Sequence, residues 1–373
     1  MILTGGAFCA VMLLWGRRQP REEILGDTRI EILRMEDFDD GQDSKLVREM
    51  RRTQADNGNP HQDTKESYIE AREEQIPTQE QGTVSQEQEL EMLEWGMPEG
   101  MQAEQMQQSI GNMEFLPRVR QQEISLEAYS DYQSLVKAFY TIDAGTMAGS
   151  DQLNVEALMS FDATIQKLDE PQILIYHTHA NEAFADSIPG EESTTIVGVG
   201  DYLSQILVQD YGYQVMHCKN SFDEGTGVDA YANALPTISG ILAENPTIQV
   251  VIDLHRDQMP ENKRLVMDVD GRPTARFMFF NGISRNRKTG NIDYLKNENL
   301  DENLSFSFQM QKKAMEYYPG LTRKIYLKSY RYNMHLKERY LLIELGAQNN
   351  TVEEAMNACG PIAQILDLVL SGQ

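Results

Sequence analysis

The chain has 373 residues, of which 40% are hydrophobic, and a formal net charge of −25 at pH 7. A chain this acidic is not expected to bind nucleic acid, because phosphate binding needs clustered lysines and arginines. The three cysteines, Cys9, Cys218 and Cys359, are too few for a disulfide framework and lack the spacing of a zinc ribbon.

The first sixteen residues are nearly all apolar or small, and Arg17 and Arg18 follow them. This run falls short of the roughly 20 residues needed to span a bilayer. No basic segment precedes it, as one would in a signal peptide. We predict that residues 1–16 are a transmembrane anchor whose true start lies upstream of Met1. A signal peptide and a buried helix are the alternatives.

Residues 17–123 are rich in Glu, Gln, Asp and Arg and poor in aromatic residues. A segment of this composition cannot bury enough apolar surface to offset the entropy lost on ordering. We therefore predict a disordered acidic tether over residues 17–123. The short apolar cluster at 90–97 is interpreted as a transient helix within it, and a docking patch is the alternative.

Regular apolar spacing begins near Ile124. Helical spacing occurs at 126–140, 154–168, 195–211, 229–243, 299–318 and 352–370. Apolar runs typical of strands occur at 172–176, 213–217, 248–255, 275–280, 325–327 and 339–345. Thr351 and Glu354 match a capping box for the last helix. Because strands alternate with helices, residues 124–373 are predicted to form one α/β domain with a mostly parallel or mixed sheet flanked by helices.

Polar side chains that can bind metals follow three of these strands. His177 and His179 come after the first strand, with Glu182 three residues further on; His255 ends another, and Glu344 lies in the last. The carboxyl ends of parallel strands open onto one edge of a sheet, so these groups can converge. Two histidines and a carboxylate, with water in the fourth position, form a known catalytic zinc arrangement. A further carboxylate such as Glu344 can serve as general base and acid.

Other catalytic patterns do not fit. Asn181 and Glu182 follow His179, so the HxHxDH pattern of metallo-β-lactamases is absent, and about 200 residues are short for a barrel of eight βα units. Neither a glycine-rich phosphate loop nor a GxSxG elbow occurs. Gly198 and Gly200 lie within a predicted helix, where they indicate close packing.

Three segments, in this order, closely resemble the stage II sporulation protein P family. They are ILIYHTHANE at 173–182, VIDLHRD at 251–257 and LIELGAQNNTVEEA at 342–355. The sequences at 138–143, 197–200 and 332–333 fit as well. The resemblance extends from about Tyr129 to the C-terminus.

The resemblance implies a fold related to the zinc-dependent N-acetylmuramoyl-L-alanine amidases. It also implies a peptidoglycan hydrolase that acts during engulfment of the forespore, removing stem peptides and in part cutting peptide cross-links. Stage II sporulation proteins D and M are the partners it implies. The expected location is the cell membrane, crossed once, with the catalytic domain on the outer side.

Residue by residue, the resemblance implies that His179 and His255 bind Zn²⁺ and that Glu344 is the catalytic glutamate. Glu182 is the preferred acidic ligand, and Glu192 is the alternative. Three further residues are expected to lie behind the ligands or to face the substrate: His177, Arg256 and Asp257. His335 stands where the family is expected to have a polar amide.

Overall fold

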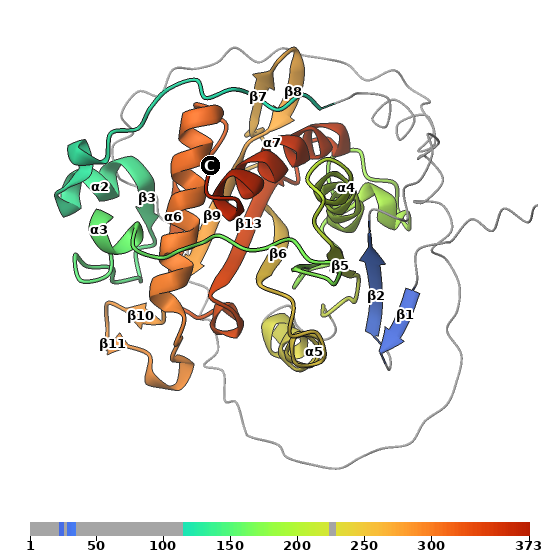
Figure 1. The fold of residues 1–373 in the computed structure, drawn as a ribbon, viewed down its shortest axis with the longest axis horizontal. Coiled ribbons are helices and arrows are strands. Elements are labelled where there is room, and N and C mark those ends of the chain that lie inside the picture. The colour runs from blue at the N-terminus through green and yellow to red at the C-terminus, as the bar shows by residue number, and fades with distance from the viewer. Residues whose placement is uncertain (1–21, 26–27, 35–114, 224–228) are drawn as a thin grey trace, which may run out of the picture.

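The computed structural model describes residues 22–25, 28–34, 115–223 and 229–373 (Figure 1). The predicted anchor at 1–16, the cluster at 90–97 and most of the predicted tether lie outside these residues. Within the described part of the chain, no helix is both long enough and apolar enough to cross a membrane.

The described residues form a sheet of nine strands in the order β1-β2-β5-β4-β6-β13-β9-β12-β3. Its strands, in chain order, are β1 (Glu22–Leu25), β2 (Thr28–Leu33), β3 (Tyr140–Ile142), β4 (Ile173–Tyr176), β5 (Val215–Cys218), β6 (Val250–Asp257), β9 (Phe277–Gly282), β12 (Ile325–Lys328) and β13 (Arg339–Ala347). Two small hairpins lie outside it: β7 (Val266–Val269) with β8 (Arg272–Ala275), and β10 (Arg285–Asn286) with β11 (Gly290–Asn291).

The α-helices are α2 (Tyr132–Phe139), α3 (Val155–Leu158), α4 (Ile196–Gln209), α5 (Ala230–Glu244), α6 (Leu300–Tyr317) and α7 (Val352–Leu370). Short 3-10 turns occupy η3 (Leu126–Tyr129), η4 (Glu192–Thr194), η6 (Asp293–Leu295) and η7 (Met334–Leu336). The predicted capping box of α7 is confirmed, since the Thr351 hydroxyl accepts from the Glu354 N–H and the Glu354 carboxylate accepts from the Thr351 N–H.

Strands β5, β4, β6 and β13 all run parallel, so their carboxyl ends open onto one edge of the sheet. Strand β13 is antiparallel to β9, and β9, β12 and β3 are parallel to one another. The prediction of an α/β domain with a mostly parallel or mixed sheet flanked by helices is therefore confirmed.

Alternating residues of each strand face two different cores. Ile173 and Ile175 belong to the larger core, which α4, α6 and α7 cover. Leu174 and Tyr176 belong to the smaller core beneath α5. Figure 1 shows α5 on the opposite side of the sheet from α4, α6 and α7. This alternation decides which polar side chains at the strand ends can meet.

Two stretches of the predicted tether are part of the folded domain. Strand β2 pairs antiparallel with β5, and its Ile30, Ile32 and Leu33 are buried. Residues 115–123 lie along α6, where the N–H groups of Gln121 and Gln122 donate to the Glu316 carbonyl. These stretches depart from the prediction because a short strand added to an existing edge buries its apolar residues against the rest of the domain. Overall composition does not reveal this.

Two predicted helices are shorter than expected. The stretch 126–140 is divided into η3 and α2, with Asp131 capping the second by accepting from two backbone N–H groups. Of the stretch 154–168 only α3 is helical, and Ile165 instead donates its N–H to the Leu370 carbonyl. Phe161 and Ile165 pack against the larger core, so their spacing reflects burial of an irregular segment rather than a helix.

Candidate active site

The predicted ligands and the predicted catalytic glutamate lie together at the carboxyl edge shared by β4, β6 and β13. The ring centroids of His179 and His255 are 5.5 Å apart. Nδ1 of His255 is 3.6 Å from Oε2 of Glu182. Glu344 is the register partner of His255 on the neighbouring strand, so both side chains leave the sheet on the same face.

His179 is held by a carboxylate on one of its ring nitrogens. Its Nδ1 lies 2.6 Å from Oδ1 of Asp223, and the other oxygen of Asp223 accepts from the Asn181 N–H at 3.3 Å. A ring that donates Nδ1–H to a carboxylate keeps the lone pair on Nε2. Histidines that bind metals are commonly oriented in this way.

His255 lies between two carboxylates. Its Nε2 is 2.7 Å from Oδ1 of Asp253, which also accepts from the backbone N–H of Thr178 at 2.9 Å. The close contact with Asp253 lacks the angles of a hydrogen bond, so Nε2 is a buried polar atom without a hydrogen-bond partner. Although burial opposes it, Asp253 and Glu182 hold the pKa of His255 well above its usual value. An excess of carboxylate around two imidazoles fits a bound divalent cation.

The carboxylate of Glu182 is held by the chain that follows His255. The Arg256 N–H donates to Oε2 of Glu182 at 2.8 Å, while the Arg256 guanidinium donates to the Ala183 carbonyl at 2.9 Å. Asp257 accepts from Arg323 at 2.6 Å. Arg256 therefore orients Glu182 and its loop.

Glu192, the alternative ligand, has a different partner. Its two carboxylate oxygens accept from the Arg29 guanidinium at 3.1 and 3.0 Å, and its side chain is 44% exposed. The structure thus places Glu182 against His255 and pairs Glu192 with strand β2. Glu182 stays the predicted acidic ligand.

Glu344 is half-buried beside this cluster. Burial raises the pKa of Glu344 to about 8; Glu182 and Asp257 raise it further, while His255 and Arg323 oppose the rise. A carboxyl group that titrates near neutral pH is suited to both accepting and donating a proton at physiological pH.

The raised pKa of Glu344 predicts a pH-dependent stability of the metal-free protein. The folded pKa is about 8 against a usual value of 4.5, so the folded chain binds more protons between these values. The stability that the protonated Glu344 contributes is fully present below pH 4.5 and is lost as the pH rises through 8. Glu344→Gln should reduce the fall in Tm between pH 5.5 and 8.5 by roughly 5–10 °C in thermal unfolding. Equal falls in the two proteins would contradict the prediction.

Three side chains of this site were given no role by the sequence. Asp253 stands two residues before His255, so strand alternation puts both on one face, and that spacing was a usable signal. Asp223 and Tyr231 carry no such signal in the sequence. Asp223 follows β5 and Tyr231 lies in α5, and only the tertiary structure brings them to the two histidines. The ring of Tyr231 lies 6.5 Å from that of His255 at an interplanar angle of 22°, and 6.0 Å from that of His179.

His177 lies on the face of the sheet opposite to His255, where it is fully buried beneath α4. Its Nε2 is 2.8 Å from Nε2 of His217, and Nδ1 is 2.7 Å from the Leu254 carbonyl oxygen. A Cβ at Gly200 would lie 2.8 Å from Nε2 of both rings, so the predicted close packing at this glycine is confirmed. The substrate-facing interpretation of His177 is wrong, because a side chain with no exposed surface cannot contact a substrate. His177 instead contacts the backbone carbonyl of Leu254, the residue before His255.

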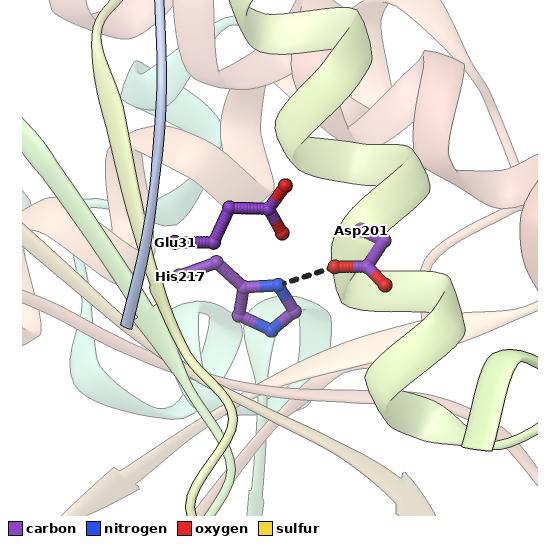
Figure 2. A group of neighbouring side chains, drawn as sticks. All are labelled: Glu31, Asp201 and His217. Atoms are coloured by element: carbon purple, nitrogen blue, oxygen red, sulfur yellow. Dashed lines mark hydrogen bonds and ion pairs between the residues drawn. The ribbon is translucent and has the colours of Figure 1, made fainter. Parts of the chain in front are cut away.

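Glu31, Asp201 and His217 form a second group with metal-binding side chains (Figure 2). Figure 2 shows Glu31 and His217 approaching from neighbouring strands and Asp201 from α4. The ammonium group of Lys219 already lies 2.8 Å from Oε2 of Glu31 and 2.7 Å from Oδ1 of Asp201. Since a lysine supplies the cation here, we assign no metal to this group.

Fold and site together define an α/β protein with two histidines and two glutamates converging at the carboxyl edge of a mixed sheet. The family model for stage II sporulation protein P matches residues 30–367. The chain belongs to this family. The matched range begins within strand β2.

A stage II sporulation protein P of Bacillus subtilis (strain 168) is 27% identical over 215 residues, which cover 53% of this chain and 50% of that protein. The chain thus matches about half the length of this curated relative.

Similar solved structures are N-acetylmuramoyl-L-alanine amidases. AmiC2 of Nostoc punctiforme is 8% identical, with 54% of this chain and 96% of that chain covered at a TM-score of 0.34. The CwlD amidase of Clostridioides difficile, solved with the GerS lipoprotein, is 14% identical, with 54% and 100% covered at a TM-score of 0.33. These scores are below 0.5, so the family assignment rests on the sequence match.

Proposed function

We propose that this protein is a zinc-dependent peptidoglycan hydrolase of sporulation that cleaves the amide bond between N-acetylmuramic acid and L-alanine. The observation that carries the proposal is the convergence of His179, Glu182, His255 and Glu344 on one edge of the sheet. Membership of the stage II sporulation protein P family supports the sporulation context and the cell wall as substrate.

Three residues would hold the zinc ion: His179, Glu182 and His255. When bound, zinc supplies a Lewis acid that polarises the amide carbonyl and lowers the pKa of water. The donor set fits, because Asp223 holds one ring nitrogen of His179 and Asp253 lies against one of His255, leaving Nε2 and Nδ1 respectively for the metal.

Glu344 would move the protons of the reaction. It is half-buried at the register position of His255, so its carboxylate can accept a proton from the attacking water. The same group can then give that proton to the departing amide nitrogen. Burial keeps its pKa close to neutral, which suits both roles.

The full-length chain, incubated with purified peptidoglycan, should release stem peptides with a free L-alanine amino group and leave lactyl ends on the glycan. Mass spectrometry of the products measures both. Removal of metal with a chelator should abolish release, and added Zn²⁺ should restore it. Activity that a chelator does not change would refute the zinc mechanism.

The same digest separates the alternatives. Cleaved cross-links without lactyl ends would show a metallopeptidase or another amidohydrolase using the same groups. Binding to the wall without any product would show a non-catalytic wall-binding module. A mixture of both products would show the endopeptidase activity that the resemblance implies beside the amidase.

The location and partners belong to the same proposal. We propose a protein anchored in the cell membrane with its catalytic domain outside, acting with stage II sporulation proteins D and M. In sporulating cells the chain should then be released from the membrane fraction by detergent and not by salt. It should also be recovered together with both partners after cross-linking.

A further inference from the structure

Strand β2 is remote in sequence from the rest of the domain but completes it in space. Residues 35–114 lie between the described stretch that contains β2 and Phe115, where the described residues resume. Strand β2 nevertheless pairs with β5 over four register positions, from Ile30 opposite Cys218 to Leu33 opposite Val215. Figure 1 shows β2 next to the edge strand β1, beside α4. The sheet of the domain therefore includes a strand from the segment that composition assigns to the tether.

A continuous chain of polar contacts begins on this strand. Oε2 of Glu31 is 2.8 Å from Nζ of Lys219, which is 2.7 Å from Oδ1 of Asp201. Oδ1 of Asp201 is in turn 2.8 Å from Nδ1 of His217. His217 contacts His177 at 2.8 Å.

The chain of contacts ends on the backbone of the candidate active site. Nδ1 of His177 is 2.7 Å from the Leu254 carbonyl oxygen. Leu254 stands between Asp253 and His255 in the sequence, and the side chains of these two neighbours contact each other. A carbonyl oxygen only accepts hydrogen bonds, so His177 must donate from Nδ1. The contact therefore fixes both the tautomer of His177 and the position of the peptide next to His255.

Most members of this chain of contacts are buried, so each charge among them depends on its partner. Glu31, Lys219, His177 and His217 are each 5% exposed or less. Although burial opposes it, Asp201 and Glu31 hold the pKa of Lys219 above its usual value. Removing the Glu31 carboxylate takes away one of the two carboxylates that contact the Lys219 ammonium group, so that group is expected to shift toward the other, Asp201.

We infer that strand β2 positions the active site, and that Glu31 is its positioning residue. Glu31 holds Lys219, Lys219 holds Asp201, and Asp201 holds His217. His217 in turn holds His177, which fixes the Leu254 carbonyl and thus the strand end that carries His255. Strand β2 is then required for the activity of the catalytic domain. The measurement of kcat rests on the proposed function. The measurement of the Kd for Zn²⁺ does not require that the chain hydrolyses peptidoglycan.

Glu31→Gln in the full-length chain tests this inference. We expect kcat on a soluble glycan fragment with stem peptide to fall about 10-fold while KM is unchanged, and the Kd for Zn²⁺ to rise about 10-fold. Glu31→Asp keeps the charge and should recover most of both values. A role limited to folding would lower Tm without changing the Kd for Zn²⁺ of the folded protein.

Ile32→Ala is the matched control. Ile32 neighbours Glu31 on the same strand but faces the smaller core beneath α5, away from the polar contacts. It should lower Tm and leave kcat and the Kd for Zn²⁺ within twofold below the unfolding transition. The inference is overturned if Glu31→Gln leaves both quantities within twofold, or if Ile32→Ala changes both as strongly as Glu31→Gln does.

The two proposals fail separately. If the wild-type chain binds Zn²⁺ but releases no stem peptide, the proposed function is wrong, and the Kd comparison still decides the role of Glu31. If the wild-type chain hydrolyses peptidoglycan and Glu31→Gln matches it in kcat and Kd, the function stands and the role of β2 is refuted.

Discussion

Replacing His255 with alanine is expected to remove bound zinc and to lower kcat by about 10³-fold or more. His255 supplies a ring nitrogen beside Glu182 and lies 5.5 Å from the ring of His179, so its loss leaves one histidine and one carboxylate. A metal ion contributes several kcal/mol of transition-state stabilisation, and each 1.36 kcal/mol is a factor of ten in rate. Metal analysis of the purified protein and a turnover assay measure the two effects.

His335→Ala is the control for this variant, because it makes the same change on η7, outside the cluster of predicted ligands. It should retain its zinc. If His255→Ala also retains one zinc ion per chain, the ligand assignment is wrong. The second group around Lys219 would then have to be reconsidered, starting with Glu31, Asp201 and His217.

Replacing Glu344 with glutamine is expected to lower kcat by roughly 10²–10⁴-fold while zinc stays bound, since general acid–base catalysis contributes about this factor. Glutamine keeps the shape of the side chain and removes its ability to exchange a proton. The Kd for Zn²⁺ should stay within a few fold, because the predicted ligands are other residues. This separation of kcat from metal binding distinguishes a catalytic carboxylate from a ligand.

Glu316→Gln provides a matched control for Glu344→Gln. Glu316 is a glutamate that is removed from solvent on another element, and it pairs with Lys312 on α6 at 2.6 Å. Its variant should retain wild-type kcat. Activity of Glu344→Gln within tenfold of wild type would remove Glu344 from the mechanism.

The two histidines at the end of β4 show why position along the chain did not settle their roles. His177 and His179 are two residues apart, and in a continuing strand they would face the same way. Strand β4 ends at Tyr176, so alternation no longer applies beyond it. His177 packs beneath α4 against His217, while His179 reaches Asp223 and the ring of His255.

The sequence by itself determined the positions of the central strands and the chemistry at their ends. Apolar runs are sufficient to place β4, β6 and β13, because a buried strand needs apolar residues on both faces. Their polar ends identify His179, His255 and Glu344 as candidates, because parallel strands share a carboxyl edge. The capping box of α7 is equally local.

The tertiary structure decided what depends on contacts between distant segments. Glu182 and Glu192 are equivalent as residue types, and the fold separates them by placing Glu182 against His255 and pairing Glu192 with Arg29. Asp223 and Tyr231 reach the site through the fold, without any periodic signal. Strand β2 is short and surrounded by polar sequence, and it is a strand because the open edge of β5 supplies its hydrogen bonds and the rest of the domain buries its apolar side chains.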